Sequence, residues 1–333
     1  AKAQNPQAAA QYDELMANLE AARKTILTSD AWRSFGFIAL AGLVTWLFAS
    51  VKKFHSTAFL ALLGLLIVTD IWVVDRRYLS SENFKKKSTV RNQFTASRAD
   101  QVIMKDEEHP NFRVLNITRD PFREVQTSYF HQSVGGYHGA KMRRYQDLID
   151  YHLSPSVNRL RRLMQEEQNP GALNNALAGM NGLNMLNTRY VIYNPQQFPI
   201  VNNAALGNVW LADNIRFVES PDKAITALHE LNIEDEVVME TDLKDKLGGF
   251  TPTPDSTETS SAKLISYKPE ELVYQVNAKE KELAVFSEIY YPKGWQAFID
   301  DEPVPHFRVN YILRALVVPE GPHKVSFTFV PKV

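Results

Sequence analysis

The sequence predicts an α+β protein that begins with two transmembrane helices in a hairpin and continues as a mixed α/β domain and a C-terminal antiparallel β-sandwich. Three observations predict this class. Two nearly uncharged apolar stretches lie at residues 35–51 and 57–74. Helix-like and strand-like patterns follow one another between residues 88 and 250, and short alternating strands fill residues 263–333.

The overall composition excludes several classes of function. The 333 residues include 37 basic and 38 acidic side chains, with a formal net charge of -1. Such a chain has no overall positive field, so we expect no nucleic-acid partner. The sequence contains no cysteine, which excludes disulfides, thiol nucleophiles and cysteine-ligated metal centres.

Residues 1–30 are expected to form a separate amphipathic helix at the membrane surface. Within "YDELMANLEAARKTIL", residues 12–27, apolar side chains recur at helical spacing and charged side chains occupy the other face. The sequence "TSD" at 28–30 then offers an N-cap for a new helix.

Residues 31–76 are predicted to form the transmembrane hairpin. At a rise of about 1.5 Å per residue, each apolar stretch reaches roughly 25 Å, near the short end for crossing a bilayer core. The tryptophans Trp32, Trp46 and Trp72 lie towards the ends of these stretches. This placement favours a membrane hairpin over the alternative, a buried hairpin of a soluble protein.

Charged residues accompany the second apolar stretch. Asp70 lies inside it, where an ionised carboxylate is costly unless it meets water, protein or a basic partner. Asp70 is therefore interpreted as functional or paired. Arg76 and Arg77 follow about two helical turns later, so the structural alternative is a salt bridge to Asp70 with snorkelling to the interface.

The rest of the chain divides into a mixed α+β domain at 88–250, a linker at 251–262 and a β-sandwich at 263–333. The linker "TPTPDSTETSSA" is rich in Thr, Ser and Pro and has no apolar periodicity. After the linker, turns such as "PKG" and "PEGP" separate short alternating strands, which is typical of a small antiparallel sandwich.

The densest group of polar residues lies in "SYFHQSVGGYHGAKMRRYQDLIDYH", residues 128–152. The two adjacent glycines permit positive φ, and a helix expected to start near Gly139 would present unpaired N–H groups and its positive dipole end to an anion. We therefore expect this segment to contact a lipid-phosphate or an acceptor. The expected contact residues are Tyr129, His131, Gly135, Gly136, Tyr137, His138, Lys141 and Arg144.

The alternative for this segment is a solvated helix face. On that interpretation Arg143 and Arg144 pair with Asp147, while neighbouring apolar side chains pack inward. His131, His138 and His152 are spaced by seven and fourteen residues, which matches no standard ligand pattern, so we expect no metal. The first two histidines are interpreted as hydrogen-bonding or stacking groups, or as loop packing.

A second candidate lies in "EIYYPKGWQAFIDDEP", residues 288–303. Tyr290, Tyr291 and Trp295 form a candidate glycan platform there, and sandwich core is the alternative. No GxSxG, GxxxxGK, HExxH or GxGxxG element is present, so no catalytic residue is assigned.

Six segments in a fixed order resemble the C-terminal part of YfhO-family bacterial membrane proteins, in the form found in Bacteroidetes-type bacteria. The likeness covers nearly the whole chain. The segments are "YDELMANLEAARKTILTSDAWRSFGFI", "TDIWVVDRRYLSSENF", "SYFHQSVGGYHGAKMRRYQDLIDYH", "LNMLNTRYVIYNP", "ALGNVWLADNIRFVES" and "FSEIYYPKGWQAFIDDEPVPHFRVNYILRALVVPEGPHKVSFTF".

The resemblance implies a multi-spanning protein of the GT-C glycosyltransferase type in the bacterial cytoplasmic (inner) membrane. The implied partners are membrane lipid, a polyprenyl-phosphate sugar and an envelope glycan acceptor, and the soluble domain is implied to be extracytoplasmic (periplasmic). This chain would then be a piece that is inactive alone and carries no cofactor. A divalent metal would belong to the full-length protein.

Two questions stay open at this point. Basic residues lie both in the short joint at Lys52 and Lys53 and after the hairpin, at Arg76, Arg77 and 85–87, so charge counting does not settle the topology. The alternative function is a non-catalytic, membrane-anchored module that binds a glycan or a protein.

Overall fold

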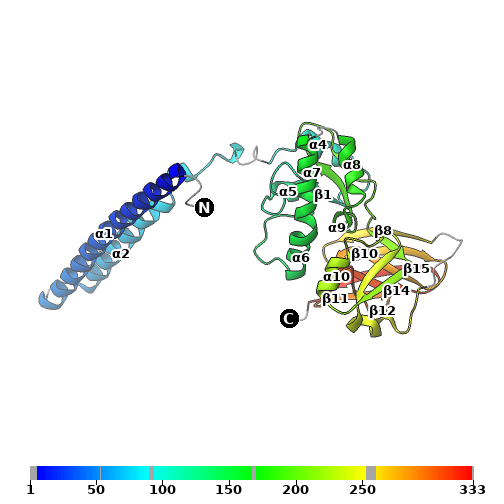
Figure 1. Ribbon diagram of the computed structural model, residues 1–333. Coiled ribbons are helices and arrows are strands. Elements are labelled where there is room, and N and C mark those ends of the chain that lie inside the picture. Colours follow the sequence, from blue (N-terminus) through cyan, green and yellow to red (C-terminus); the bar gives the residue numbers. More distant parts are fainter. Residues whose placement is uncertain (1–5, 53, 90–93, 167–169, 253–259, 332–333) are drawn as a thin grey trace. The chain divides into compact units, whose positions relative to one another are not determined.

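The computed structural model describes residues 6–52, 54–89, 94–166, 170–252 and 260–331. The chain divides into two compact units, Ala1–Gln93 and Phe94–Val333. We call the second of these the C-terminal unit. The predicted class, an α+β chain with two membrane-type helices and C-terminal antiparallel sheets, is confirmed (Figure 1).

The first unit is a helical hairpin of α1 (Pro6–Ser50) and α2 (Ser56–Tyr78), followed by a short 3₁₀ turn at Ser81–Asn83. The expected helix start at 28–30 is wrong, because α1 runs through it without a break. The Thr28 hydroxyl donates to the carbonyl of Lys24 at 2.9 Å, one helical turn earlier, instead of capping a new helix. The amphipathic and apolar segments therefore form one long helix.

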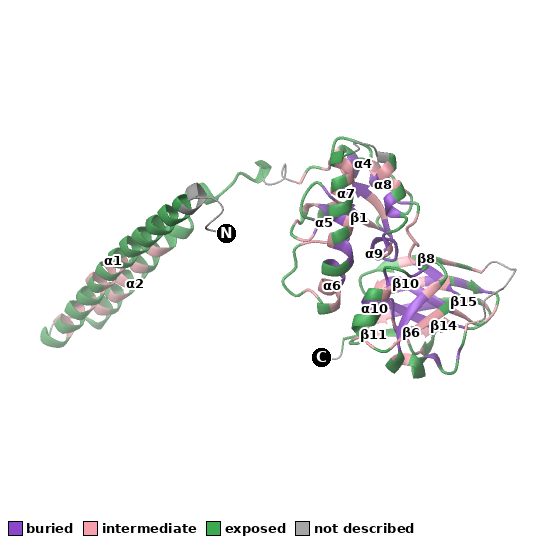
Figure 2. Ribbon diagram, viewed as in Figure 1, coloured by how far each residue is buried: buried purple, intermediate pink, exposed green. Residues whose placement is uncertain are grey.

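Both helices are long and apolar enough to cross a membrane, and their apolar windows are not buried within the structure. Figure 2 shows the hairpin as mainly exposed ribbon. The rings of Phe48 and Phe59 stack at 4.4 Å near the turn and join the two helices. Large exposed side chains such as Trp46 and Leu65 cover the remaining surface, as expected for helices solvated by lipid.

The C-terminal unit opens with a small mixed sheet, in the order β2-β1-β3-β4, with helices around it. Its strands are β1 (Arg113–Asn116), β2 (Gln132–Ser133), β3 (Thr188–Ile192) and β4 (Ile200–Val201). The helices are α4 (Arg98–Ile103), α5 (Gln126–Phe130), α6 (Arg143–Leu148), the π-helical segment η2 (Ile149–Leu153), α7 (Ser154–Glu166), α8 (Pro170–Leu177) and α9 (Asn181–Asn184).

Two antiparallel sheets form the sandwich, in the orders β13-β14-β10-β5 and β12-β11-β15-β9-β8. Their strands are β5 (Val209–Ala212), β8 (Ser261–Lys268), β9 (Glu271–Ala278), β10 (Glu282–Ile289), β11 (Trp295–Ile299), β12 (Glu302–Val304), β13 (Phe307–Val309), β14 (Leu313–Val318) and β15 (Gly321–Phe329). The remaining elements are the parallel pair β6 (Asn214–Val218) and β7 (Glu236–Glu240), the helix α10 (Pro221–Ala227) and the 3₁₀ segment η3 (Thr241–Leu247).

The β5–β10 sheet is buried on both faces. On β10, Leu283 and Val285 pack into the core shared with the helices and the mixed sheet, while Ala284 and Phe286 pack into the core between the two sandwich sheets. Strand β5 precedes the predicted linker in the chain, yet it pairs with β10. A chain beginning at residue 263 would therefore leave β10 without this neighbour. Residues 253–259 of the linker lie outside the described part of the chain.

Candidate functional site

The charged side chains of the hairpin form two ion pairs between its helices. Nε of Arg33 lies 3.5 Å from Oδ1 of Asp70, and Nη1 of Arg77 donates to Oδ1 of Asp30 at 2.6 Å. The predicted salt bridge from Asp70 to Arg76 or Arg77 is therefore corrected, because the partner of Asp70 is Arg33 on the other helix. A single-helix pattern could not reveal this pairing.

The depth of these pairs follows from the helical rise of about 1.5 Å per residue. Arg33 and Asp70 lie roughly 20–25 Å along the helices from the turn at residues 51–55, and Asp30 and Arg77 lie roughly 30 Å from it. The apolar core of a bilayer is about 30 Å thick. With the turn at one interface, Asp30 and Arg77 lie at the opposite interface and Asp70 about one turn inside it. Pairing with Arg33 offsets the cost of holding Asp70 there.

The Gly135–Gly136 pair serves the packing of the loops in the C-terminal unit. A Cβ atom at Gly135 would lie 2.0 Å from the carbonyl oxygen of Pro121, and Gly136 has a φ of +105°. The N–H of Gly136 donates to that same oxygen at 2.7 Å. Both positions thus require glycine to bring residues 119–124 against the loop before α6.

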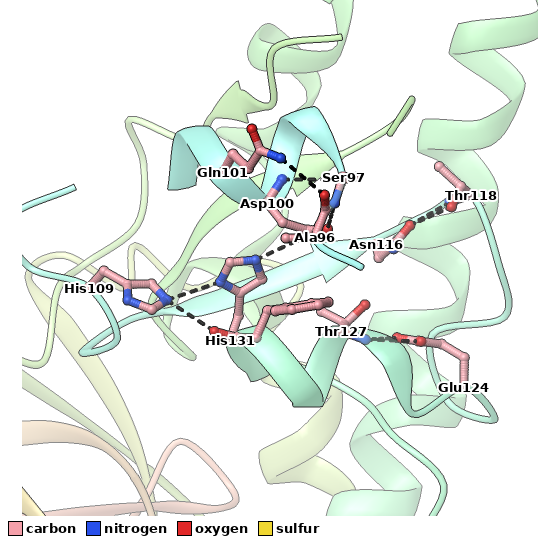
Figure 3. A network of polar contacts seen from close by, with 11 residues as sticks. Ala96, Ser97, Asp100, Gln101, His109, Asn116, Thr118, Glu124, Thr127 and His131 are labelled. Atoms are coloured by element: carbon pink, nitrogen blue, oxygen red, sulfur yellow. Dashed lines mark hydrogen bonds and ion pairs between the residues drawn. The ribbon is translucent and has the colours of Figure 1, made fainter. Parts of the chain in front are cut away.

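His131 is buried in a chain of polar contacts (Figure 3). Its Nε2 lies 3.1 Å from Oδ1 of Asp100, and its Nδ1 lies 3.1 Å from Nε2 of His109. His109 Nε2 also lies 3.1 Å from the carbonyl of Phe130, the last residue of α5. The geometry fits a His131 tautomer that donates from Nε2 to Asp100 and accepts at Nδ1 from His109, whose one Nε2–H is shared with the Phe130 carbonyl. The predicted stacking group is thus a structural link between α4 and α5.

The Asp100 carboxylate is held by more than His131. Asp100 and Ser97 form a capping box at the start of α4, in which each side chain accepts the backbone N–H of the other. Burial alone would raise the pKa of the Asp100 carboxyl, but the hydrogen bonds from His131 and Ser97 hold it below its usual value. Burial, followed by the proximity of His131, lowers the pKa of His109. The arrangement therefore favours the ionised form of Asp100 and the neutral form of His109.

The basic residues of the segment have different environments. The helix starts at Arg143 and not near Gly139, so no helix N-terminus lies at Lys141. Arg144 donates to the buried carboxylate of Glu240 at 2.8 Å and to the carbonyl of Tyr311 at 3.1 Å. The exposed Arg143 pairs with the partly buried carboxylate of Asp147 at 2.9 Å, as the alternative predicted. Lys141 has no ion-pair partner among the residues that the structure describes.

Three of the predicted contact residues face solvent. Tyr129, Tyr137 and His138 are exposed, and the ring of Tyr129 stacks on Phe94 with 4.7 Å between ring centres. Nδ1 of His138 accepts the N–H of Ala140 at 3.0 Å, which closes a short turn in the loop. The exposed groups are therefore aromatic and basic, whereas His131 and Arg144 point into the fold.

The predicted glycan platform borders an open pocket of about 660 Å³ at the end of β11 and β15. Two of its three residues, Tyr291 and Trp295, line this pocket, and the third, Tyr290, lies beside His306 instead. The guanidinium of Arg314 lies 4.1 Å from the centre of the Trp295 ring. The complete lining is Tyr291, Pro292, Lys293, Gly294, Trp295, Gln296, Phe329, Val330 and Pro331.

The pocket combines the groups that bind sugars. Aromatic rings can stack on the apolar face of a pyranose, while an amide and an ammonium group can bond its hydroxyls. Gln296 and Lys293 supply these polar groups here. In the described ranges of the chain, no three His, Asp or Glu side chains are grouped so that they could hold a metal ion.

The part of the chain that contains the pocket is similar to a known protein family. Residues 249–333 match the family model described as "Bacterial membrane protein YfhO". The C-terminal quarter of the chain is thus similar to YfhO-family bacterial membrane proteins. No curated protein and no solved structure matches it.

The YfhO match contains every strand from β8 to β15 and therefore the whole lining of the pocket. It does not include the hairpin, the loops around Gly135 or strand β5, although β5 completes one sandwich sheet. The region that matches the YfhO model thus packs against a strand from an earlier part of the chain.

His152 gives the stability of the protein a testable pH dependence. It lies in the π-helical segment η2, is 5% exposed, and its Nε2–H donates to the carbonyl of Ile225 at 2.7 Å. Burial lowers the pKa of His152 to about 4. Between pH 6.5 and 4 the unfolded chain binds this proton and the folded chain does not, so stability is lost as the pH falls.

We expect the full titration of His152 to cost on the order of 3 kcal/mol of unfolding free energy. Denaturant unfolding at pH 7, 5.5 and 4.5 measures it. His152→Gln keeps a donor for Ile225 but removes the titration, so its stability should fall less over this range than that of the parent. Parallel curves for parent and variant would contradict the assignment, and His138→Gln, at an exposed loop histidine, is the matched control.

Proposed function

We propose that this chain is the membrane-proximal and extracytoplasmic part of a GT-C-type glycosyltransferase-like protein. The complete protein would transfer a sugar from a polyprenyl-phosphate donor to a cell-envelope polymer or lipid, at the outer face of the bacterial cytoplasmic membrane. The YfhO family match carries this proposal, and the two membrane-type helices support it. The metal and the catalytic carboxylates would come from other membrane segments.

The exposure and contacts of the proposed residues favour some of them over others for contact with the lipid-phosphate or the acceptor. Tyr129, Tyr137, His138 and Lys141 remain candidates, because they lie at or near the surface. The other four have structural contacts. Gly135 and Gly136 pack on Pro121, His131 binds Asp100, and Arg144 binds Glu240. The proposed contact is therefore aromatic and weakly basic, and not an arginine-lined phosphate cradle.

Cysteine labelling tests the topology on which the donor class depends. The chain has no cysteine, so Lys52→Cys in the hairpin turn and Glu320→Cys in the exposed turn between β14 and β15 each introduce one thiol. In intact cells that carry the full-length protein, we expect a membrane-impermeant maleimide to label residue 320. Residue 52 should react only after lysis.

The two positions control for one another, because a hairpin places its turn and its following domain on opposite sides of a membrane. The reverse pattern would put the C-terminal unit in the cytoplasm and overturn the polyprenyl-phosphate donor. Labelling of both positions, or of neither, in intact cells would contradict a spanning hairpin.

The second candidate is a non-catalytic, membrane-anchored module that binds a glycan or a protein, and the pocket at Trp295 is the observation that favours it. Tyr291→Ala removes one exposed ring from the pocket without opening a core. In the detergent-solubilised chain we expect about a tenfold loss of affinity for envelope glycan fragments, the value of one stacked ring.

Isothermal titration calorimetry measures this loss, and Tyr151→Ala, at another exposed tyrosine, is its control. Equal affinities for the parent and the Tyr291 variant would exclude the pocket as a glycan site. Equal loss of glycan affinity in both variants would mean that the loss does not come from the pocket.

A further inference from the structure

The loops around Gly135 and Gly136 expose a group of apolar and basic side chains that no described part of the fold covers. Val125, Tyr129, Tyr137 and Met142 are 54%, 63%, 73% and 36% exposed. The bond from Gly136 to the Pro121 carbonyl and the closeness of Gly136 to Ser128 bring their loops side by side. We call these four residues, with the basic side chains of Arg119, Arg123, Lys141 and Arg143, the loop surface.

The charge of the loop surface is positive. From Arg119 to Arg144 the chain contains five basic residues and two carboxylates, and only one of the basic residues, Arg144, is committed to the core. Arg123 forms an exposed pair with Asp120, whereas the exposed guanidinium of Arg143 pairs with the partly buried Asp147, which also accepts the Tyr311 hydroxyl. Neither Arg119 nor Lys141 has a side-chain ion pair within the part of the chain that the structure describes. Exposed pairs exchange readily with other anions, because water screens them.

The loop surface lies where the chain enters the C-terminal unit. Phe94, the first residue of that unit, stacks on Tyr129. The membrane-type helix α2 ends at Tyr78, so residues 79–93 form the connection, which can span at most about 50 Å when fully extended. The connection contains the exposed residues Lys85, Lys86 and Lys87. The connection to α2 therefore enters the C-terminal unit next to Tyr129, a residue of the loop surface.

We propose that the loop surface docks on the anionic lipid headgroups of the membrane that α2 spans. Tyrosine rings are suited to the boundary between headgroups and hydrocarbon, and basic side chains are attracted to anionic lipids within a Debye length. In this proposal the four apolar side chains insert into the headgroup region, and the basic side chains bind the anionic headgroups. This docking needs no transferase chemistry, so its test is independent of the proposed function.

An environment-sensitive fluorophore at Tyr137→Cys tests the contact in the full chain, reconstituted in nanodiscs of phosphatidylcholine with phosphatidylglycerol. We expect a blue-shifted emission and quenching by lipids that carry a nitroxide near the headgroup. Both effects should grow with the fraction of phosphatidylglycerol. The same fluorophore at Glu320→Cys, in the turn after β14, should show neither. Arg119→Gln with Lys141→Gln should reduce the quenching at residue 137 at least twofold.

Three results would overturn the proposal. Equal quenching at residues 137 and 320 would mean that the loop surface has no preferred contact with lipid. Quenching that does not change with phosphatidylglycerol would exclude anionic headgroups. A blue shift without quenching would show that protein covers the surface, either a second copy or other segments. The same fluorophore at Met142→Cys should give the same result as at Tyr137→Cys. An unfolding midpoint equal to that of the parent shows that neither substitution disturbs the fold.

Discussion

Glu240→Ala is expected to destabilise the C-terminal unit by about 3 kcal/mol, because it leaves two arginines without their shared carboxylate. Glu240 is 7% exposed at the end of β7. Arg144 from α6 donates to it at 2.8 and 3.3 Å, and Arg308 from β13 donates to it at 3.1 and 3.2 Å. The carboxylate thus connects three elements that are distant in the sequence.

The expected cost reflects the uncompensated charges more than the lost hydrogen bonds. The side chains of Arg144 and Arg308 are 24% and 19% exposed, so water can solvate them only in part after the carboxylate is removed. Two like charges would then face each other in a region of low dielectric. Glu240→Gln keeps an acceptor and should have an intermediate effect.

Denaturant unfolding of the full chain in detergent, followed by tryptophan emission, measures the Glu240 effect. Glu219→Ala is the matched control, since Glu219 also pairs with a basic residue, Lys223, but on an exposed helix start. This control should leave the unfolding midpoint unchanged. If Glu240→Ala behaves like Glu219→Ala, the two arginines reach solvent by themselves and the buried triad contributes no stability.

The parts of the fold that are local in sequence could be predicted from it. Short alternating strands were expected to fill residues 263–333, and strands β8 to β15 run from Ser261 to Phe329. Their alternation is a property of neighbouring residues. The hairpin is equally local, because an apolar stretch of this length is itself the signal.

The missed features depend on contacts between distant segments. Strand β5 precedes the linker in the chain and yet belongs to the sandwich. Its four residues "VWLA" do not indicate that their partner strand is β10. The break expected at 28–30 was wrong for a related reason. Thr and Ser can cap a helix or bond back to the preceding turn, and the surrounding helical residues decide which occurs.

The candidate site shows the same limit. The sequence marked His131 and Arg144 by their residue types, but their partners Asp100 and Glu240 lie 31 and 96 residues away. A buried carboxylate that neutralises a basic residue cannot be recognised without the fold. Asp70 was marked by its apolar surroundings, which correctly indicated a partner, whereas the identity of that partner, Arg33, came from the antiparallel packing of two helices.

Gly135→Ala tests whether the glycine pair serves packing or flexibility, and we expect a loss of about 3 kcal/mol of unfolding free energy. The new Cβ atom would lie 2.0 Å from the carbonyl oxygen and 2.6 Å from the carbonyl carbon of Pro121. These are backbone atoms and cannot rotate away. The loop at residues 119–124 must therefore move, which also breaks the 2.7 Å bond from Gly136 to Pro121.

Gly139→Ala, four residues later in the same loop, is the matched control for Gly135→Ala. No atom lies within 4 Å of a Cβ at Gly139, and its φ is not in the left-handed region. Alanine there restricts the unfolded chain without a clash, so stability should stay the same or rise slightly. If both substitutions have the same small effect, the loop does not need the close approach at Pro121. If only Gly135→Ala is costly, the glycine pair is a packing device, and the loop surface that it supports is held in a fixed shape.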